Sequence, residues 1–327
     1  EGRRGEEGRM CILALALNAN DDFPAILLFN RDERFDRPTT SLKVHDDGLV
    51  CAKDMQAGGT WMALHRDSGA FAALTNVRCS PQAGVQLQSR GQLLSRVLQG
   101  DTDALQSDAY AQFNLLHGVL RTNRPSDVSL SASTPSDRGE GAWRTQTVPV
   151  SVPNDVPTVL VKTNDSTGLF TAKGSPSGDS AWPKAAWLRV EVEQLLQTAP
   201  ACVGRAGAEL LLHLLLPAMS ATSLPEPQAF EAATARGEFS HVPESLERKY
   251  QAAPFIEPLD QSQGEGDEPV WYGTVSQTAI FVCRSECAAY IAYREIARPA
   301  PLACSTAGAA AHSDWQWVCV PLVGEHC

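Results

Sequence analysis

The chain has 327 residues, of which 43% are hydrophobic and 20% are charged, so it can bury a sizeable core in one large domain or two ordinary ones. A small disulfide-stapled scaffold and a disordered chain are therefore excluded. The 27 Lys and Arg residues against 38 Asp and Glu give a formal net charge of −11, which provides no general attraction to nucleic acid or to an anionic membrane. We expect no nucleic-acid partner.

The cysteines and the apolar stretches bear on the compartment. Nine cysteines are scattered along the chain, unlike the dense, even pattern of a secreted scaffold, so a reducing compartment is favoured, with free thiols at Cys283 and Cys287. The apolar stretches 11–17 and 208–219 are shorter than the roughly 20 residues of a membrane-spanning helix. The sequence predicts a soluble, cytoplasmic protein without a transmembrane segment.

The N-terminal third is predicted to consist of strands and one helix. Residues 1–9 contain no hydrophobic side chain and are interpreted as a disordered leader or an expression remnant. A helix is predicted at 89–99, where apolar residues recur at helical spacing and a glycine follows. Short apolar segments bounded by Asn, Asp, Gly or Pro are typical of strands and cover 12–17, 25–29, 49–52, 60–64 and 70–77, the last two as a hairpin.

The middle of the chain mixes both element types. Residues 113–120 predict a strand, and the Ser-, Pro- and Asp-rich stretch 122–141 predicts a mobile surface loop. Apolar faces at helical spacing predict two helices that cover a sheet, at 185–198 and 206–216. Three further strands are predicted at 145–152, 158–163 and 168–172, and the prolines in and around them indicate edge positions or short lengths.

The C-terminal part is predicted to hold a hairpin between two loops. Mobile loops are expected near 225–269 and 297–311 because both are rich in small residues and proline. The paired strands and a final strand are predicted at 270–283, 288–296 and 315–320. The expected organisation is one domain over 10–322 followed by a tail at 323–327.

Strands in two groups with helices between them predict an α+β layered sandwich and argue against the alternating order of a doubly wound sheet. The pair Gly58-Gly59 lacks the spacing of a dinucleotide-binding loop, and no Walker-type lysine motif occurs. No second Cys or His pair accompanies Cys283 and Cys287 at a zinc-type spacing. The sequence thus predicts no cofactor and no metal site.

Cys11 is the first candidate catalytic residue. It follows Met10, and a small second residue permits removal of an initiator methionine, which would leave Cys11 with a free α-amine. That amine titrates near 7.7 to 8.0 in model compounds and can act as the general base for its own thiol. The alternative interpretation is that the residue merely begins a hydrophobic strand.

The tetrapeptide Asn30-Arg31-Asp32-Glu33 places an amide, a guanidinium and two carboxylates at the end of an apolar strand. It is either a solvated turn or part of a site. An Asp beside a terminal amine would hold and orient its cationic form, and an Arg would bind a carboxylate or phosphate. Asn76, which closes another strand, can offer an amide N–H to a developing oxyanion.

Four ordered segments carry a family resemblance: Met10-Cys11-Ile12, Asn30-Arg31-Asp32-Glu33, Gly58-Gly59-Thr60-Trp61 and Ala73-Leu74-Thr75-Asn76. The set resembles the signature of the NRDE family, known as transport and Golgi organisation protein 2. The resemblance extends to about Trp315. Its later segments are Phe113-Asn114-Leu115-Leu116, Trp182-Pro183-Lys184, Leu224-Pro225-Glu226-Pro227, Tyr272-Gly273-Thr274 and Arg294-Glu295.

The resemblance implies an αββα sandwich of the N-terminal-nucleophile-hydrolase type, with Cys11 as the nucleophile. By that analogy Asp32 pairs with the α-amine and Asn76 helps to form an oxyanion hole. The substrate-binding residues implied are Asn30, Arg31, Glu33 and Trp61.

Two departures from the family pattern weaken the catalytic interpretation. Where family members show Leu-Ser-Asn, this chain has Leu169-Phe170-Thr171, so a second oxyanion amide is missing unless Asn164 supplies it. Where the family shows Tyr-Gly-Thr-Arg, this chain has Val275, so a cationic substrate contact is lost. Removing one oxyanion donor typically costs about 3 to 4 kcal/mol in the barrier.

The resemblance implies a role in Golgi organisation and secretion, and in haem or acyl-lipid trafficking, with association to the Golgi or the mitochondrion. The favoured hypothesis is a soluble carrier of a hydrophobic small molecule such as haem or acyl-CoA. The alternative is an amidase or thioesterase that uses Cys11. A Golgi-associated scaffold is a third interpretation. His213, on an apolar helix, is interpreted as a core histidine.

Overall fold

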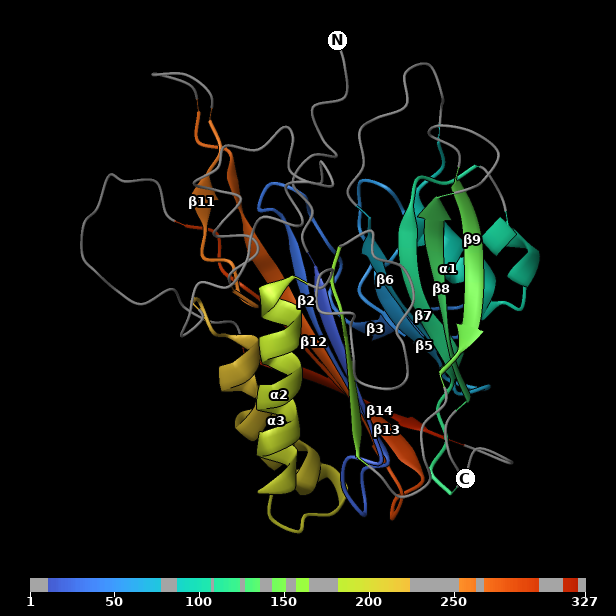
Figure 1. The fold of residues 1–327 in the computed structure, drawn as a ribbon, viewed down its shortest axis with the longest axis vertical. Coiled ribbons are helices and arrows are strands. Elements are labelled where there is room, and N and C mark those ends of the chain that lie inside the picture. The colour runs from blue at the N-terminus through green and yellow to red at the C-terminus, as the bar shows by residue number, and fades with distance from the viewer. Residues whose placement is uncertain are drawn as a thin grey trace.

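The computed structural model describes residues 11–77, 87–106, 109–123, 127–135, 143–150, 157–164, 182–223, 253–262, 268–299 and 314–322. These residues form an α+β fold of two antiparallel sheets with helices on their outer sides (Figure 1). In Figure 1 the sheets lie face to face in the middle of the molecule.

The first sheet brings together strands from both ends of the chain. Its order is β10-β1-β2-β12-β13-β14, with β11 paired to β12. The longest pairing joins β2 to β12 and places Asp32 opposite Thr274, next to a register shift between Thr274 and Ser276. The strands are β1 (Ile12–Leu17), β2 (Ala25–Arg34), β10 (Thr158–Lys162), β11 (Leu259–Asp260), β12 (Trp271–Cys283), β13 (Ala288–Glu295) and β14 (Gln316–Pro321).

The second sheet follows the chain from neighbour to neighbour, because each strand turns back on the one before it. The hairpin predicted after Gly58-Gly59 is its β5–β6 pair. The strands in order are β3 (Lys43–Val44), β4 (Leu49–Cys51), β5 (Met62–His65), β6 (Ala70–Asn76), β7 (Phe113–Val119), β8 (Asp127–Pro135) and β9 (Trp143–Pro149).

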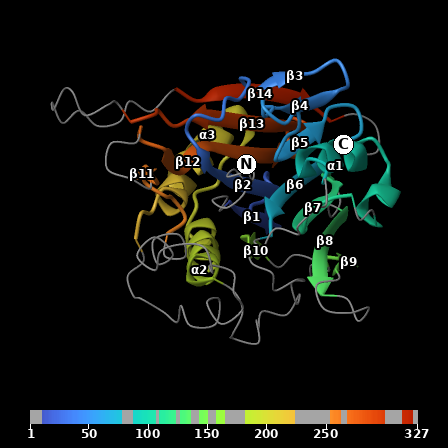
Figure 2. The ribbon, with the colours of Figure 1, turned by 90° about the horizontal axis from the view of Figure 1, so that it is seen from above.

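Three apolar cores separate four layers. One core lies between α2 (Pro183–Gln197), α3 (Gly204–Met219) and the first sheet, and a second lies between the two sheets. A third lies between the second sheet and α1 (Arg90–Leu98), which the short 3₁₀ helix Thr102–Gln106 follows. Figure 2 shows this succession from above. The order is that of an αββα sandwich.

The alternation of side chains along β1 explains how one strand serves two cores. The even-numbered Ile12, Ala14 and Ala16 face α2 and α3, while the odd-numbered Leu13 and Leu15 face the second sheet. Since every residue of β1 is buried, the strand reads as a continuous apolar run.

Asp22 connects three segments at one end of the sandwich, opposite the end where the polar residues of β2 lie. Its carboxylate accepts hydrogen bonds from the N–H of Gly204, at the start of α3, at 2.9 Å and from the N–H of Ser285 at 2.7 Å. Gly204 has φ +60°, a conformation that favours glycine. One buried carboxylate therefore joins the β1–β2 turn, α3 and the β12–β13 turn.

Most predicted elements are confirmed, and the differences have identifiable causes. The predicted loop 122–141 is wrong in part, because β8 lies inside it and pairs with β7 and β9. Its Ser residues alternate with Val128 and Leu130, whose side chains are buried, so the polar composition hid a strand. The short strands β3 and β11 and the 3₁₀ helix were not predicted.

Other expectations concern the ends and the thiols. The leader 1–9, the strand 168–172, most of the loops 225–269 and 297–311 and the tail 323–327 lie outside the described residues. The predicted helix after residue 206 continues through Pro217, to Met219. Cys283 is a free thiol, but Cys287 is disulfide-bonded, so the free-thiol prediction is wrong for Cys287. This bond counts against the reducing compartment inferred from the cysteine pattern.

Candidate active site

Cys11 stands at the start of β1 with its side chain in the core between the sheets and 6% of its surface exposed. Burial raises the pKa of its thiol to about 12, and the charge of Asp32 acts in the same direction. A hydrogen bond from the Asp32 backbone N–H and the charge of Arg31 oppose this shift. The thiol is therefore protonated at neutral pH, and Cys11 needs a base before it can act as a nucleophile.

Asp32 lies on the neighbouring strand β2 and is 1% exposed. Its Oδ1 accepts a hydrogen bond from the Thr274 hydroxyl at 2.7 Å, while its Oδ2 is buried and has no hydrogen-bond partner among the described residues. Burial raises the pKa of Asp32 to about 7, although the charge of Lys184 and the Thr274 hydrogen bond lower it. The unsatisfied oxygen leaves room for one more donor, the kind that an α-amine of Cys11 would provide.

Two asparagines lie beside the Cys11 end of β1. The β1–β10 pairing is antiparallel and joins Leu13 to Lys162, so Asn164, two residues after the end of β10, lies toward the end of β1 that Cys11 precedes. Asn164 is fully buried, and its Nδ2 donates a hydrogen bond to the main-chain oxygen of Asn76 at 2.5 Å. The side chain of Asn164 is thus held against the main chain of Asn76, while Leu169-Phe170-Thr171 lies outside the described residues.

A buried cross-sheet contact holds these asparagines in place. The hydroxyl of Thr75 on β6 donates to the main-chain oxygen of Thr163 at 2.7 Å. The same oxygen accepts a hydrogen bond from Asn114 Nδ2 on β7 at 3.1 Å. Since Thr163 precedes Asn164 and Thr75 precedes Asn76, bonds between the sheets fix the main chain at both asparagines.

Arg31 points to the opposite face of β2 from Asp32 and enters a buried charge network. Its guanidinium carbon lies 4.5 Å from the centre of the Trp61 ring, and its Nη2 lies 3.1 Å from Asp54 Oδ2. Arg37 Nε also contacts Asp54, at 2.5 Å, and lies 3.6 Å from a carboxylate oxygen of Glu33. Burial acts to raise the pKa of Asp54, but its bonds to Arg37, Ala57 and Arg31 lower it.

This network accounts for the burial of Arg31 and Glu33, while Asn30 and Asp32 make other hydrogen bonds. Arg31 Nη1 is buried and has no hydrogen-bond partner among the described residues, so one guanidinium N–H pair is available to a ligand. The tetrapeptide is therefore part of β2 and not a solvated turn.

Asn30 has hydrogen-bond partners in a different part of the fold from the other predicted site residues. Its Nδ2 donates to the main-chain oxygens of Met219 at 2.7 Å and Pro254 at 2.9 Å, and its Oδ1 accepts from Gln277. These bonds tie β2 to the C-terminal end of α3. The structure therefore directs the Asn30 side chain to α3, while Arg31 contacts Trp61 and Asp32 lies on the strand next to Cys11. Asn76 ends β6 of the second sheet.

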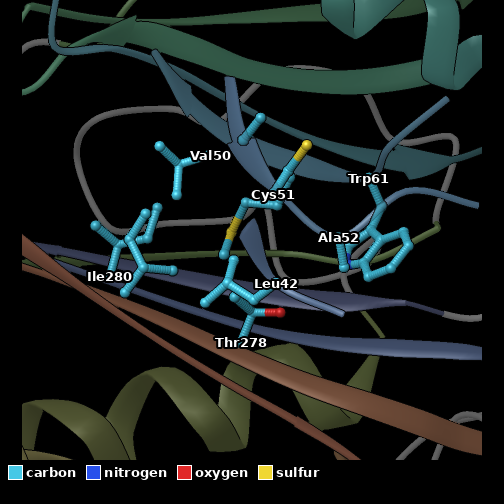
Figure 3. A pocket seen from close by; sticks show the side chains of 10 residues that line it. Leu42, Val50, Cys51, Ala52, Trp61, Thr278 and Ile280 are labelled. Carbon is cyan, nitrogen blue, oxygen red and sulfur yellow. The ribbon is translucent and has the colours of Figure 1, made fainter. Parts of the chain in front are cut away.

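A small apolar pocket opens between the sheets beside Trp61 (Figure 3). Its empty volume is about 230 Å³, and Thr278 is the only lining residue that carries a side-chain hydroxyl. Trp61 joins this pocket to the Arg31 guanidinium. The other lining residues are Leu42, Val50, Cys51, Ala52, Met62, Ala63, Ile280 and Ile291.

Sequence reasoning missed several residues of this region. Thr274 and Lys184 lie in the Tyr-Gly-Thr and Trp-Pro-Lys segments, so the signal was present but no role was assigned. Asp54 had no signal at all, because it stands in a loop that only the fold brings to Arg31. His213 is exposed, and its Nδ1 lies 2.7 Å from the Glu209 carbonyl oxygen, so the prediction of a core histidine is wrong.

Within the described ranges, no three His, Cys, Asp or Glu side chains are placed to hold a metal ion. In the same part of the chain, no helix combines the length and the apolar character that crossing a membrane requires.

Comparison with known proteins assigns the family. A comparison with curated proteins gives no match. The family model described as Transport and Golgi organisation 2 matches residues 10–294, which is most of the chain and includes every residue of the site described above. The chain therefore belongs to the Transport and Golgi organisation 2 family.

Proposed function

We propose that this protein is an N-terminal cysteine hydrolase of N-terminal-nucleophile type, which cleaves an amide or thioester of a small apolar acyl group. The observation that carries the proposal is Asp32 on the strand adjacent to Cys11, with a buried Oδ2 that can accept a hydrogen bond from an α-amine. Asn164, which follows the strand paired with β1 and bonds to the main chain of Asn76, supports it. Asn164 is the candidate for the second side-chain amide of the oxyanion hole.

The reaction begins with the thiol proton of Cys11. With Met10 and everything before it removed, the α-amine of Cys11 takes this proton, and the thiolate attacks the carbonyl carbon of the substrate. The raised pKa of the buried thiol makes such a base necessary. The leaving amine or thiol then receives the proton back from the α-ammonium group, and an acyl thioester remains on Cys11.

Deacylation uses the same groups in reverse. Water loses a proton to the α-amine, attacks the acyl thioester and releases the carboxylic acid and the Cys11 thiol. In both steps negative charge develops on the carbonyl oxygen, where amide N–H groups of Asn76 and Asn164 would stabilise it. Asp32 orients the α-ammonium through its free Oδ2.

The test compares hydrolysis rates of short-chain acyl thioesters and acyl amides by the chain that begins at Cys11. We expect Asn164→Ala to lower kcat by about 100-fold or more with little change in KM, since it removes a donor used mainly in the transition state. Leu210→Ala, at an exposed position of α3, is the control and should keep the full rate. Equal rates for all three proteins would contradict the proposed site.

Binding without cleavage is the second candidate, and the apolar pocket beside Trp61 favours it. If Cys11 remains linked to Met10, the thiol has no base and the site can only hold a ligand. The empty space beside Trp61, about 230 Å³, includes volume open to solvent, so the enclosed part is small and favours a short acyl group over haem. Binding of acyl-CoA and of haem to the chain retaining Met10, measured by calorimetry, tests this candidate.

A further inference from the structure

Arg294 carries a positive charge into the layer between the first sheet and α3. It lies on β13, on the face of the sheet that α3 covers, and only 7% of its surface is exposed (Figure 1). The next residue, Glu295, points to the other face, where it accepts hydrogen bonds from the hydroxyls of Thr39 and Tyr293. In the part of the chain that the structure describes, Arg294 forms no ion pair. Burial lowers the pKa of Arg294, but a guanidinium stays charged at neutral pH, so its charge remains without a counter-charge.

A row of three polar side chains fixes the guanidinium. The strand registers place Asn30 of β2 opposite Gln277 of β12, and Gln277 opposite Arg294. Arg294 donates to Gln277 Oε1 from Nε, at 2.8 Å, and from Nη2. Gln277 Nε2 donates in turn to Asn30 Oδ1 at 2.9 Å and to the main-chain oxygen of Met219 at 3.2 Å. These partners are neutral, so they orient the guanidinium without balancing its charge.

The hydrogen bonds to Gln277 leave one edge of the guanidinium free. A guanidinium has N–H donors on Nε, Nη1 and Nη2. Gln277 engages Nε and Nη2, whereas Nη1 of Arg294 has no hydrogen-bond partner among the described residues. Unlike Arg31 Nη1, this atom is not sealed inside the protein, so a ligand can reach it. The adjacent N–H groups of Nη1 and Nη2 form the fork that a carboxylate fills with two parallel hydrogen bonds.

Trp315 and an apolar hollow lie beside this free edge. The guanidinium carbon of Arg294 lies 4.9 Å from the centre of the ring of Trp315, the residue before β14. Trp315 and Gln277 both line a hollow between α3 and the first sheet, whose empty volume of about 220 Å³ includes space open to solvent. The enclosed part is therefore small and suits a short apolar group. Its apolar walls are Leu28, Phe29, Leu212, Leu216, Met219 and Ala279.

We propose that Arg294 and Trp315 form a binding site for a small monocarboxylate, whose carboxylate occupies the free edge of the guanidinium and whose short apolar chain lies against Trp315 and the hollow. A single negative charge matches the single unbalanced cation. A phosphate dianion would bring excess charge into an apolar surrounding. Because Cys11 lies in the core on the other side of the first sheet, the inference does not depend on the proposed function.

The first experiment measures the binding of butyrate to the whole chain by isothermal titration calorimetry. For so small a ligand we expect a Kd of about 1 mM. Butyramide has the same shape without the charge and should bind at least about tenfold more weakly, because hydrogen bonds to a charged group are the stronger ones. Inorganic phosphate has no apolar chain and should also bind more weakly than butyrate. No binding of butyrate, or equal affinity for butyramide or phosphate, would overturn the proposal.

Substitutions at two arginines locate the site. Arg294→Met should weaken butyrate binding at least about tenfold, and Arg294→Lys should weaken it in part, because an ammonium group cannot form the fork. Arg205→Met is the matched control. The guanidinium carbon of Arg205 also lies over a tryptophan, 3.9 Å from the centre of the Trp317 ring, but its Nε is paired with Glu209 at 2.9 Å. Arg205→Met should therefore keep the wild-type affinity. Wild-type affinity in Arg294→Met, or an equal loss in both methionine variants, would overturn the proposal.

A measurement on the wild-type chain covers the case in which Arg294→Met does not fold, since this variant leaves the buried Gln277 Oε1 without its donors. The indole N–H signal of Trp315 in a ¹⁵N NMR spectrum is assigned with Trp315→Phe. It should shift when butyrate is added and stay in place with butyramide. The Trp317 indole signal, assigned in the same way, is the internal reference and should shift less. Butyrate binding without a shift at Trp315 would place the ligand elsewhere and overturn the proposal.

Discussion

Thr274→Val removes one hydroxyl from the wall of the site and keeps the shape of the side chain. This hydroxyl donates to Asp32 Oδ1 at 2.7 Å and accepts from the N–H of Ile256 at 2.9 Å. A hydrogen bond to a charged group contributes about 1.5 to 3 kcal/mol, and one pKa unit corresponds to about 1.4 kcal/mol. The pKa of Asp32, about 7 in the wild type, should therefore rise by about 1 to 2 units.

The same substitution leaves the buried N–H of Ile256 without its acceptor, which costs about 1 to 3 kcal/mol of unfolding free energy. The two effects are measured by NMR titration of Asp32 and by urea denaturation. Thr278→Val, four residues along β12, is the matched control, because its hydroxyl does not bond to Asp32. If both variants show the same stability and the same Asp32 titration, the reasoning about Thr274 is wrong.

Three further predictions concern stability. Burial raises the pKa of Asp32 from 3.8 to about 7, so between these pH values the folded state keeps a proton that the unfolded state releases. The free energy of unfolding should therefore fall as pH rises from 4 to 8. Asp32→Asn should remove this pH dependence in thermal melts. Hydrogen bonds from Gly204 and Ser285 outweigh burial and lower the pKa of Asp22. Urea denaturation should therefore show that Asp22→Ala lowers the free energy of unfolding by about 2 to 4 kcal/mol at pH 7 and by less below pH 4. Leu211→Ala, at a fully buried position, should lose about 2 to 5 kcal/mol by the same assay, whereas Leu210→Ala, at a position 45% exposed, should lose far less.

The elements that depend on local pattern could be predicted from the sequence. β1 is a continuous apolar run, α3 has apolar residues nearly all round, and the β12–β13 hairpin turns at a polar tripeptide. By contrast, β8 is stabilised by its two neighbours in the sheet and not by its own composition. A strand in which Ser alternates with apolar residues resembles a loop until its partners are known.

For the site too, some residues could be predicted from local sequence and others depend on tertiary contacts. The family segments identified Cys11, Asp32 and Asn76, and the structure places them on neighbouring strands or across the sheets. The role of Asn30 could not be read from its place beside Arg31, because successive residues of a strand face opposite layers. Asp54 is separated from the tetrapeptide in sequence, so its ion pair with Arg31 depends on the fold, as does the effect of the Lys184 charge on Asp32.

The most direct test of the central claim is the intact mass of the protein after reaction with a short-chain acyl thioester. The chain that begins at Cys11 is compared with the matched chain that retains Met10. We predict a mass increase of one acyl group in the first chain, located at Cys11 by peptide mapping, and no transient acylation in the second. Acylation of both chains to the same extent, or of neither, would contradict the assignment of the Cys11 α-amine as the catalytic base.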